Sequence, residues 1–260
     1  MTTGANTAVY FISDFHAGLQ DEKTEQLKLD KLERLFALIK AEGRSLYMLG
    51  DILDYWLEFR HVIPKGFSRL FCLLSDLVRH NVEVFYVAGN HDFYLGRYFD
   101  DELGIKTLYG MHEHQIDGRN FIFAHGDGLG SGDIGYKLFA RFVRNRFNLA
   151  LLAGFHPDLA IGLMKKLSLL SRKHKPDNRV FETDRLLNFA ESLAMEREFD
   201  YFLCGHNHVG GEKELSGGRK RYINLGTWIE GSAPYGVFRD GIFQLKDLYN
   251  VNSIDSRCHE

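Results

Sequence analysis

The sequence has few cysteines, no long hydrophobic run and little net charge, and each of these shortages excludes a class of protein. Its 260 residues include only three cysteines, an odd number without the spacing of zinc ligands, which indicates a reducing compartment. No apolar run approaches the roughly 18 residues of a membrane-spanning helix. A formal net charge of −3 provides no overall attraction to nucleic acid, and the N-terminal residues do not resemble a signal peptide. We therefore expect a cytoplasmic protein that is soluble or bound peripherally to a membrane.

Short segments rich in β-branched and aromatic residues predict the strands of a covered sheet. They lie at residues 8–12, 45–49, 82–88, 120–124, 199–204 and 221–225. Between the early segments the apolar residues follow a helical period. One predicted helical face contains Leu32, Leu35, Phe36 and Ile39. We predict one α/β domain over residues 1–260, in which helices cover mixed sheets.

One region differs from the rest of the chain in charge. Residues 136–175 carry nine Lys or Arg and a single acid, Asp158, although the whole protein is slightly acidic. Phe, Leu and Ile recur there at helical spacing, and Pro157 lies near the predicted start of a second helix. We predict a helical, basic and apolar insertion at residues 130–176. It could cover a lipid substrate or be an ordinary amphipathic hairpin; nucleic-acid binding is not expected, because interleaved exposed aromatics are not evident.

Polar side chains follow five of the predicted strands. They are Asp14, His16, Asp51, Asp54, Asn90, His91, Asp92, His125, Asp127, His206 and His208. Residues i and i+2 of an extended chain project to the same face, and ligand sites of open α/β sheets collect at the carboxyl ends of strands. We therefore expect these side chains to meet at one edge of the sheet, where they would need a cation to offset their mutual repulsion.

Some of these residues are candidate metal ligands, and they are too many for one tetrahedral ion. The candidates are Asp14, His16, Asp51, Asn90, His125, His206 and His208. The set suits two divalent cations that share Asp51, as in two-metal phosphoryl-transfer sites. Carboxylate, amide and imidazole ligands favour Mn²⁺, Fe²⁺, Zn²⁺ or Mg²⁺ over softer ions.

Each motif taken alone has a simpler interpretation. A single histidine at a strand end, such as His16 or His125, is often only hydrogen-bonded, and the segment "HNH" by itself could be a turn. Asp54 and Asp92 could orient a metal ligand or His91, or they could be simple caps. The joint pattern, with the motifs in sequence order after successive strands, favours a metal centre.

In this order the motifs resemble those of the calcineurin-like metallophosphoesterases, which are D-x-H, G-D-x-x-D, G-N-H-D, H and G-H-x-H. The matching segments are "DFH", "GDILD", "GNHD", "HGD" and "GHNH", between residues 14 and 208. The resemblance implies a four-layer α/β/β/α sandwich with a helical cap insertion. It implies that the first metal binds Asp14, His16, Asp51 and His208. The second metal would bind Asp51, Asn90, His125 and His206.

Three longer segments carry a narrower resemblance: "GDILDYWLEFRHVIPKGF", "HGDGLGSGDIGYK" and "FHPDLAIGL…SR". They resemble the UDP-2,3-diacylglucosamine diphosphatases of lipid A biosynthesis, especially the form found in Bacteroidota. The resemblance implies cleavage of the pyrophosphate of a UDP-linked diacylated sugar to UMP and 2,3-diacylglucosamine 1-phosphate, with manganese as the favoured metal. A diacylated substrate, together with the basic and apolar insertion, favours peripheral binding to the cytoplasmic face of the inner membrane. The better-known branch carries Arg where this chain has His91.

The resemblance implies roles for individual side chains as well. His91 and Asp92 would act in catalysis, with His91 either a general acid for a poor leaving group or a positive charge near the transition state. Substrate contacts would come from Asn90, His91, Asp127, Asp133, Arg172 and His206. A different phosphomonoester, nucleotide or phosphodiester substrate stays open, as does a non-catalytic binding scaffold on the same fold. The sequence also leaves the oligomeric state open.

Overall fold

The strands form two sheets. The computed structural model describes residues 7–92, 94–130, 145–173 and 179–249. A six-stranded sheet has the order β11-β10-β1-β2-β3-β4, with β1 (Ala8–Ile12), β2 (Gly43–Leu49), β3 (Glu83–Val87), β4 (Lys106–Leu108), β10 (Pro234–Arg239) and β11 (Ile242–Asp247). A five-stranded sheet has the order β5-β6-β7-β9-β8, with β5 (His112–Ile116), β6 (Arg119–Phe123), β7 (Tyr201–Cys204), β8 (Gly211–Glu214) and β9 (Arg221–Asn224).

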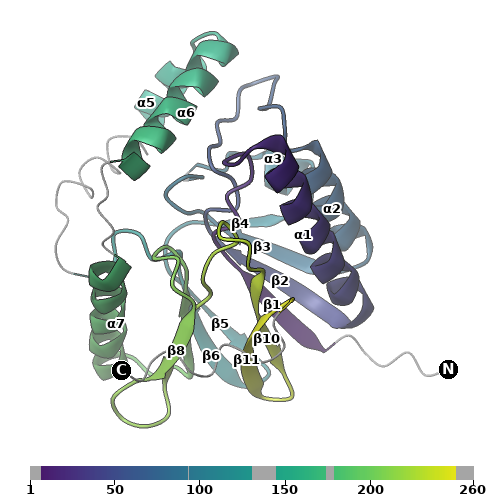
Figure 1. The fold of residues 1–260 in the computed structure, drawn as a ribbon. Helices are drawn as coiled ribbons and strands as arrows, with labels where there is room; N and C mark the ends of the chain where they lie inside the picture. The colour runs from purple at the N-terminus through teal and green to yellow at the C-terminus, as the bar shows by residue number, and fades with distance from the viewer. Residues whose placement is uncertain (1–6, 93, 131–144, 174–178, 250–260) are drawn as a thin grey trace.

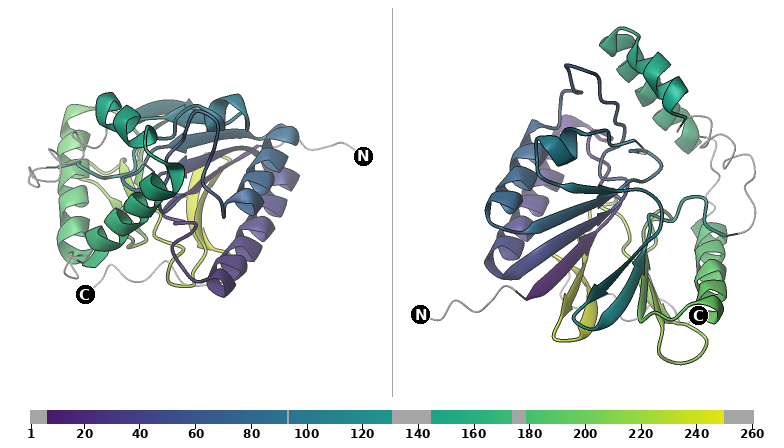
Figure 2. Two further views of the ribbon diagram at one scale, coloured as in Figure 1. Left: turned by 90° about the horizontal axis from the view of Figure 1, so that it is seen from above. Right: turned by 180° about the vertical axis from the view of Figure 1, so that it is seen from behind.

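Helices cover the outer face of each sheet (Figure 1, Figure 2). Helices α1 (Glu22–Glu42) and α2 (Ser68–Arg79), with the short α3 (Tyr98–Asp101), lie on the six-stranded sheet. Helix α7 (Arg179–Glu196) packs on the five-stranded sheet. The two sheets face each other across an aromatic core, in which the ring centroids of Phe11 and Phe121 lie 5.7 Å apart. The predicted α/β/β/α sandwich is confirmed.

Strand β1 is buried on both faces, and this explains why its sequence is apolar throughout. Tyr10 and Ile12 belong to the core beneath the helices, whereas Val9 and Phe11 belong to the core between the two sheets. Successive side chains of a strand point to opposite faces. A strand covered on both sides therefore needs apolar residues at every position, as parallel strands in α/β proteins do.

The predicted apolar face of α1 is also confirmed. Its buried residues include Leu32, Leu35, Phe36 and Ile39. The helix begins after Asp21, whose carboxylate accepts the backbone N–H of Thr24 at 3.1 Å, as a typical N-cap does.

Parallel pairing brings the important loops to one edge of the sandwich. Strands β1, β2 and β3 are parallel neighbours, and so are β6, β7 and β9 in the other sheet. The loops that follow β1, β2, β3, β6 and β7 therefore gather at the carboxyl-terminal edge, beneath a pair of helices (Figure 1).

Those two helices, α5 (Arg146–Ala153) and α6 (Pro157–Lys173), lie within the predicted insertion. Pro157 is the first residue of α6, as the sequence indicated. Residues 131–144 of the insertion, and those after Lys173, lie outside the described residues. Among the described helices, none is both long and apolar enough to cross a membrane.

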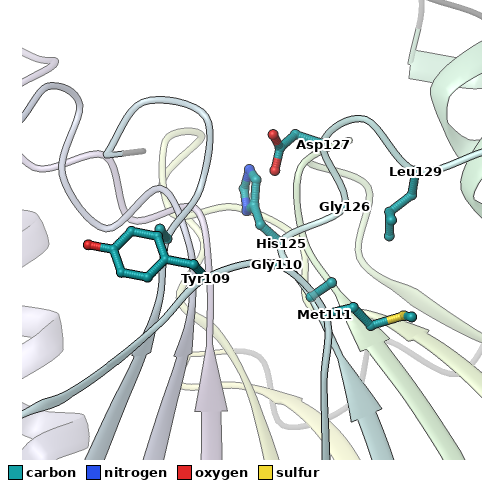
Figure 3. A pocket seen from close by; sticks show the side chains of 9 residues that line it. Tyr109, Gly110, Met111, His125, Gly126, Asp127 and Leu129 are labelled. Atoms are coloured by element: carbon teal, nitrogen blue, oxygen red, sulfur yellow. The ribbon is translucent and has the colours of Figure 1, made fainter. Parts of the chain in front are cut away.

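The six predicted segments leave five of the described strands unassigned: β4, β5, β8, β10 and β11. Two of these, β4 and β5, lie between the two sheets in the chain. Strand β4 has only three residues, and β5 reads HEHQI, with a single buried residue, Ile116. Neither offers the apolar run or regular alternation by which a strand is recognised. Their importance is in the connection between the two sheets, which carries Tyr109, Gly110 and Met111 past the polar edge (Figure 3).

Candidate metal centre

The structure brings the seven predicted metal ligands together at the carboxyl-terminal edge. Five strands supply them, and each ligand lies within a few residues of its strand's last residue. Strand β1 is followed by Asp14 and His16, β2 by Asp51, β3 by Asn90, β6 by His125, and β7 by His206 and His208.

The first group of ligands consists of Asp14, His16 and His208. Nε2 of His208 lies 3.2 Å from Oδ1 of Asp14, and Nε2 of His16 lies 3.8 Å from the same oxygen. The two Nε2 atoms are 3.3 Å apart. Three donor atoms at such separations can hold one metal ion.

The second group consists of Asn90, His125 and His206. Nε2 of His125 lies 3.0 Å from Oδ1 of Asn90 and 3.3 Å from Nδ1 of His206. Asp51 lies between the groups, because its Oδ2 is 3.3 Å from Nε2 of His125 and 3.6 Å from Nε2 of His16. This is the placement that a ligand shared between two ions requires.

Several of these residues have unusual backbone conformations. The following have φ between 48° and 73°: Asp14, His16, Asp51, His206 and His208. Non-glycine residues in the left-handed region cost of order 1–3 kcal/mol each, and such strain persists only where the surrounding structure enforces it. Strain concentrated on ligand positions is typical of a functional site.

Glycines next to the ligands allow the loops to approach closely. A Cβ atom on Gly205 would lie 2.1 Å from Oδ2 of Asp14, and one on Gly50 would lie 2.5 Å from Nδ1 of His125. Only a residue without a side chain leaves room for these ligands.

Hydrogen bonds from neighbouring groups fix the orientation of two histidine ligands. Nδ1 of His125 lies 2.9 Å from the backbone oxygen of Leu49, so this nitrogen donates and Nε2 presents a lone pair to the centre. Nδ1 of His16 lies 3.3 Å from Oδ1 of Asp54. Both arrangements are of the kind that orients metal-binding histidines and strengthens them as ligands.

Asp92 holds the loop that carries Asp51. Its fully buried carboxylate accepts backbone N–H groups from Gly89 at 2.7 Å, Ile52 at 2.8 Å, Asp51 at 3.1 Å and Leu53 at 3.2 Å, and also the hydroxyl of Tyr86. These contacts fit the orienting role that the sequence analysis left open for Asp92, because its oxygens point at backbone N–H groups; its catalytic role stays a prediction.

The pKa of Asp92 agrees with that arrangement. Burial and the charge of Asp51 raise this pKa, whereas the hydrogen bonds from Tyr86 and from the backbone of Gly89 favour the ionised form. An ionised carboxylate is an acceptor only, as its surroundings require.

His91 lies beside the ligands without being one of the seven. Its backbone N–H donates to Oδ1 of Asp51 at 2.8 Å, and its Nδ1 lies 3.0 Å from the backbone oxygen of Asp54. Its ring centroid is 4.9 Å from that of His16. The contact at Nδ1 turns the opposite ring nitrogen, Nε2, away from Asp54.

The buried carboxylates and imidazoles shift one another's pKa. Burial lowers the pKa of His16, but hydrogen bonds with Asp14 and Asp54 and the charge of Asp51 outweigh it and raise the value to about 9. The pKa of His125 is also raised, because the charge of Asp51 outweighs burial. Conversely, the histidines hold the pKa values of Asp14 and Asp51 below the ordinary range despite burial. A cluster of this kind attracts positive charge, as protons or as metal ions.

The remaining residues predicted to contact substrate are Asp127, Asp133 and Arg172. Asp127 and His125 line a pocket of about 150 Å³, together with Tyr109, Met111 and Leu129 (Figure 3). Asp133 lies outside the described residues, and so does the side chain of Arg172 on α6.

Ser168 was missed by the sequence analysis. It is a buried residue of α6, and its hydroxyl donates to Oδ2 of Asp54 at 2.9 Å. The only available signal was a serine within the apolar run "KLSLL", which is too common to single out a residue.

The chain is similar over most of its length to known proteins. The chain is 33% identical over 237 residues to a UDP-2,3-diacylglucosamine hydrolase of Porphyromonas gingivalis. The aligned region covers 85% of this chain and 90% of that protein. It is 34% identical over 221 residues to the protein of the same name from Neisseria gonorrhoeae, covering 84% and 89% of the two chains.

A solved structure described as a novel archaeal phosphodiesterase covers 93% of this chain and 99% of its own, at 14% identity and a TM-score of 0.48. The profile of the family described as calcineurin-like phosphoesterase matches residues 7–210. The chain therefore belongs to the calcineurin-like phosphoesterase family and is a metal-dependent hydrolase.

Proposed function

We propose that the protein hydrolyses the pyrophosphate of UDP-2,3-diacylglucosamine to UMP and 2,3-diacylglucosamine 1-phosphate, a step of lipid A biosynthesis. The observation that carries the proposal is the pair of candidate ligand groups joined by Asp51. They lie at the edge of the sandwich that faces the amphipathic hairpin formed by α5 and α6 (Figure 1). The relatives named for this substrate align over 85% and 84% of the chain.

The proposed centre holds two divalent cations, with manganese favoured. Asp14, His16 and His208 would bind one, Asn90, His125 and His206 the other, and Asp51 both. Bound there, the two cations would polarise the phosphoryl oxygens and supply a nucleophile from water at neutral pH. The oxygen and nitrogen donors fit such ions, and none of the described ligand atoms is a thiolate.

We propose that His91 assists departure of the leaving group. Its Nδ1 is engaged by the backbone of Asp54, so Nε2 is the nitrogen that would face substrate. A sugar 1-phosphate needs little proton assistance, so His91 would act there mainly as a positive charge; an alkoxide leaving group would need its proton. Further substrate contacts are proposed for Asn90 and His206 at the centre. Beside it, the proposed contacts are Asp127, Asp133 and Arg172.

The hairpin would meet the acyl chains and the membrane surface. Its described side chains include five exposed apolar ones, with exposed fractions from 47% to 86%: Phe147, Leu151, Phe155, Leu159 and Leu163. Lys165 and Lys166 are exposed nearby. Basic residues near an anionic surface contribute about 1 kcal/mol each, and apolar side chains beside them suit a lipid interface. We propose that the protein binds peripherally to the cytoplasmic face of the inner membrane through this hairpin.

The test is product analysis with defined substrates. Purified protein loaded with Mn²⁺ is incubated with UDP-2,3-diacylglucosamine, with UDP-N-acetylglucosamine and with p-nitrophenyl phosphate, and the products are identified by mass spectrometry. We expect UMP and the lipid 1-phosphate from the first substrate, at a kcat/KM far above the other two.

Two outcomes would contradict the proposal. Faster turnover of a substrate without acyl chains would point to another phosphoester. Stable binding of the lipid substrate without any turnover, in protein whose metal content is verified, would point to a binding scaffold.

A further inference from the structure

Helix α6 is the second helix of the hairpin, and it contacts residues next to the metal centre. Its residue Ala160 packs against Leu57 and Phe59, and Met164 joins the main core. The ammonium of Lys165 lies 4.8 Å from the ring centroid of Tyr55. One face of α6 therefore packs on residues 55–59, in the segment that follows Asp51.

Ser168 makes a polar contact between α6 and this segment. Its exposed fraction is only 8%, and its Oγ donates to Oδ2 of Asp54 at 2.9 Å. The same Oγ lies 3.3 Å from Nδ1 of His91. A buried hydroxyl that bonds to a carboxyl oxygen restricts the orientation of that group, so this contact is well placed to hold the Asp54 carboxyl group in one orientation.

Asp54 in turn contacts two histidines of the metal centre, His16 and His91. While Oδ2 receives the hydroxyl of Ser168, Oδ1 lies 3.3 Å from Nδ1 of the ligand His16. The backbone oxygen of Asp54 lies 3.0 Å from Nδ1 of His91. One residue thus connects α6 with a predicted metal ligand and with the histidine beside it, although Ser168 and Asp54 are 114 residues apart in sequence.

We propose that Ser168 is a positioning residue of the hydrolase, through which seating of the hairpin fixes Asp54 and thereby His16 and His91. The inference rests on the proposed metal centre and not on the lipid substrate. Groups that orient metal ligands typically change metal affinity or activity by about 10–100-fold when removed. The hairpin would then have two roles: contact with the substrate, and completion of the centre itself.

The experiment compares Ser168→Ala with Ser168→Thr, which keeps the hydroxyl, and with Ser192→Ala as matched control. Within the part of the chain that the structure describes, the hydroxyl of Ser192 bonds inside its own helix α7, to the backbone oxygen of Asn188 at 3.0 Å. Two quantities are measured: the Kd for Mn²⁺, by titration of metal-free protein, and the kcat for bis(p-nitrophenyl) phosphate, a diester without acyl chains.

We expect Ser168→Ala to weaken Mn²⁺ binding by about tenfold or more and to lower kcat for the small diester by a similar factor. Ser168→Thr should recover most of both, and Ser192→Ala should change neither. Unchanged Mn²⁺ affinity and small-diester turnover in Ser168→Ala would overturn the proposal, and a loss confined to the lipid substrate would identify Ser168 as a substrate contact instead.

A double-mutant cycle with Asp54→Asn tests the route. If Ser168 acts through Asp54, Ser168→Ala should weaken Mn²⁺ binding far less in the Asp54→Asn background than in the wild type. Equal factors in both backgrounds would overturn the route. Should Ser168→Ala fail to fold, Ser168→Cys fills a similar volume with a weaker donor and gives the same comparison. None of these readouts needs the lipid, so failure of the proposed substrate would be seen separately.

Discussion

The backbone of Gly89 passes so close to the carboxylate of Asp51 that a Cβ atom on Gly89 would lie 2.3 Å from Oδ1 of Asp51. Real Cβ atoms do not approach an oxygen so closely, so any side chain at Gly89 must displace the shared ligand. The loops after β2 and β3 are therefore fitted to each other at the position where the two ligand groups meet.

Gly89→Ala should accordingly disrupt the centre. We expect the affinity for Mn²⁺ to fall by at least about tenfold, as when a ligand loses its orientation. Isothermal titration of metal-free protein gives the comparison. Gly162→Ala, on α6, is the control, because a Cβ there meets nothing within 4 Å. Wild-type metal affinity in Gly89→Ala would show that Asp51 is not held as described.

Asp51→Asn keeps the size and shape of the side chain but removes its negative charge. The amide fits the same space but cannot neutralise two cations, so we expect less metal per chain and a fall in turnover of at least about a thousandfold. Elemental analysis and kcat measure the two effects. The control is Asp117→Asn, an exposed acid paired with Arg44 at 2.9 Å in a distant turn. A full complement of two metals in Asp51→Asn would contradict the shared ligand.

The pKa of His16, raised to about 9, predicts how metal-free protein responds to pH. A histidine whose folded pKa exceeds its unfolded value of roughly 6.5 stabilises the fold below that pH and loses this contribution as pH rises through the folded pKa. After chelation, the Tm should therefore fall between pH 6.5 and pH 9.

Excess Mn²⁺ should flatten this dependence, because the cation replaces the bound protons. Thermal melts with chelator and with Mn²⁺, at matched ionic strength, measure the difference. A Tm that rises with pH over this window in chelated protein would show that the imidazoles are not protonated by the neighbouring carboxylates.

His91→Ala should discriminate between leaving groups. Loss of a general acid typically costs about 10²-fold or more, but only where the leaving group needs a proton. We therefore expect a larger fall in kcat for an alkyl phosphodiester than for a pyrophosphate substrate, measured with the same Mn²⁺-loaded enzyme. Equal losses on the two substrates would assign His91 a purely electrostatic or structural role.

Polar substitution of the hairpin should release the protein from membranes. We expect the triple variant Phe147→Ser, Leu151→Ser and Leu159→Ser to bind anionic phospholipid vesicles at least about tenfold more weakly, because partial burial of each side chain contributes to binding. Turnover of a small diester should be unchanged.

The matched control replaces exposed apolar residues elsewhere: Leu27→Ser, Met195→Ser and Ile242→Ser, with exposed fractions of 55%, 80% and 60%. Vesicle sedimentation compares the two variants. If both lose binding equally, the hairpin is not the membrane contact.

The clustering of the candidate ligand residues was predictable because each motif is local in the sequence. Asp14 with His16, and His206 with His208, are spaced so that both members can face one volume, and each pair follows an apolar strand. The family motifs and the parallel strands then placed these segments at one edge. The α/β class was predictable for the same reason, since β1 and α1 each carry a clear period in their own sequence.

Other features depend on contacts between distant segments, which no local period encodes. Asp92 looks like a further polar residue of the site, yet the four backbone N–H groups it accepts turn it toward the loop of Asp51. Ser168 is an unremarked serine in an apolar helix until α6 is placed on Asp54. The sequence by itself determined which groups can bind metal, because ligand chemistry belongs to the side chains. Only the tertiary structure decided which groups hold those ligands in place, because that depends on how loops and α6 pack against one another in space.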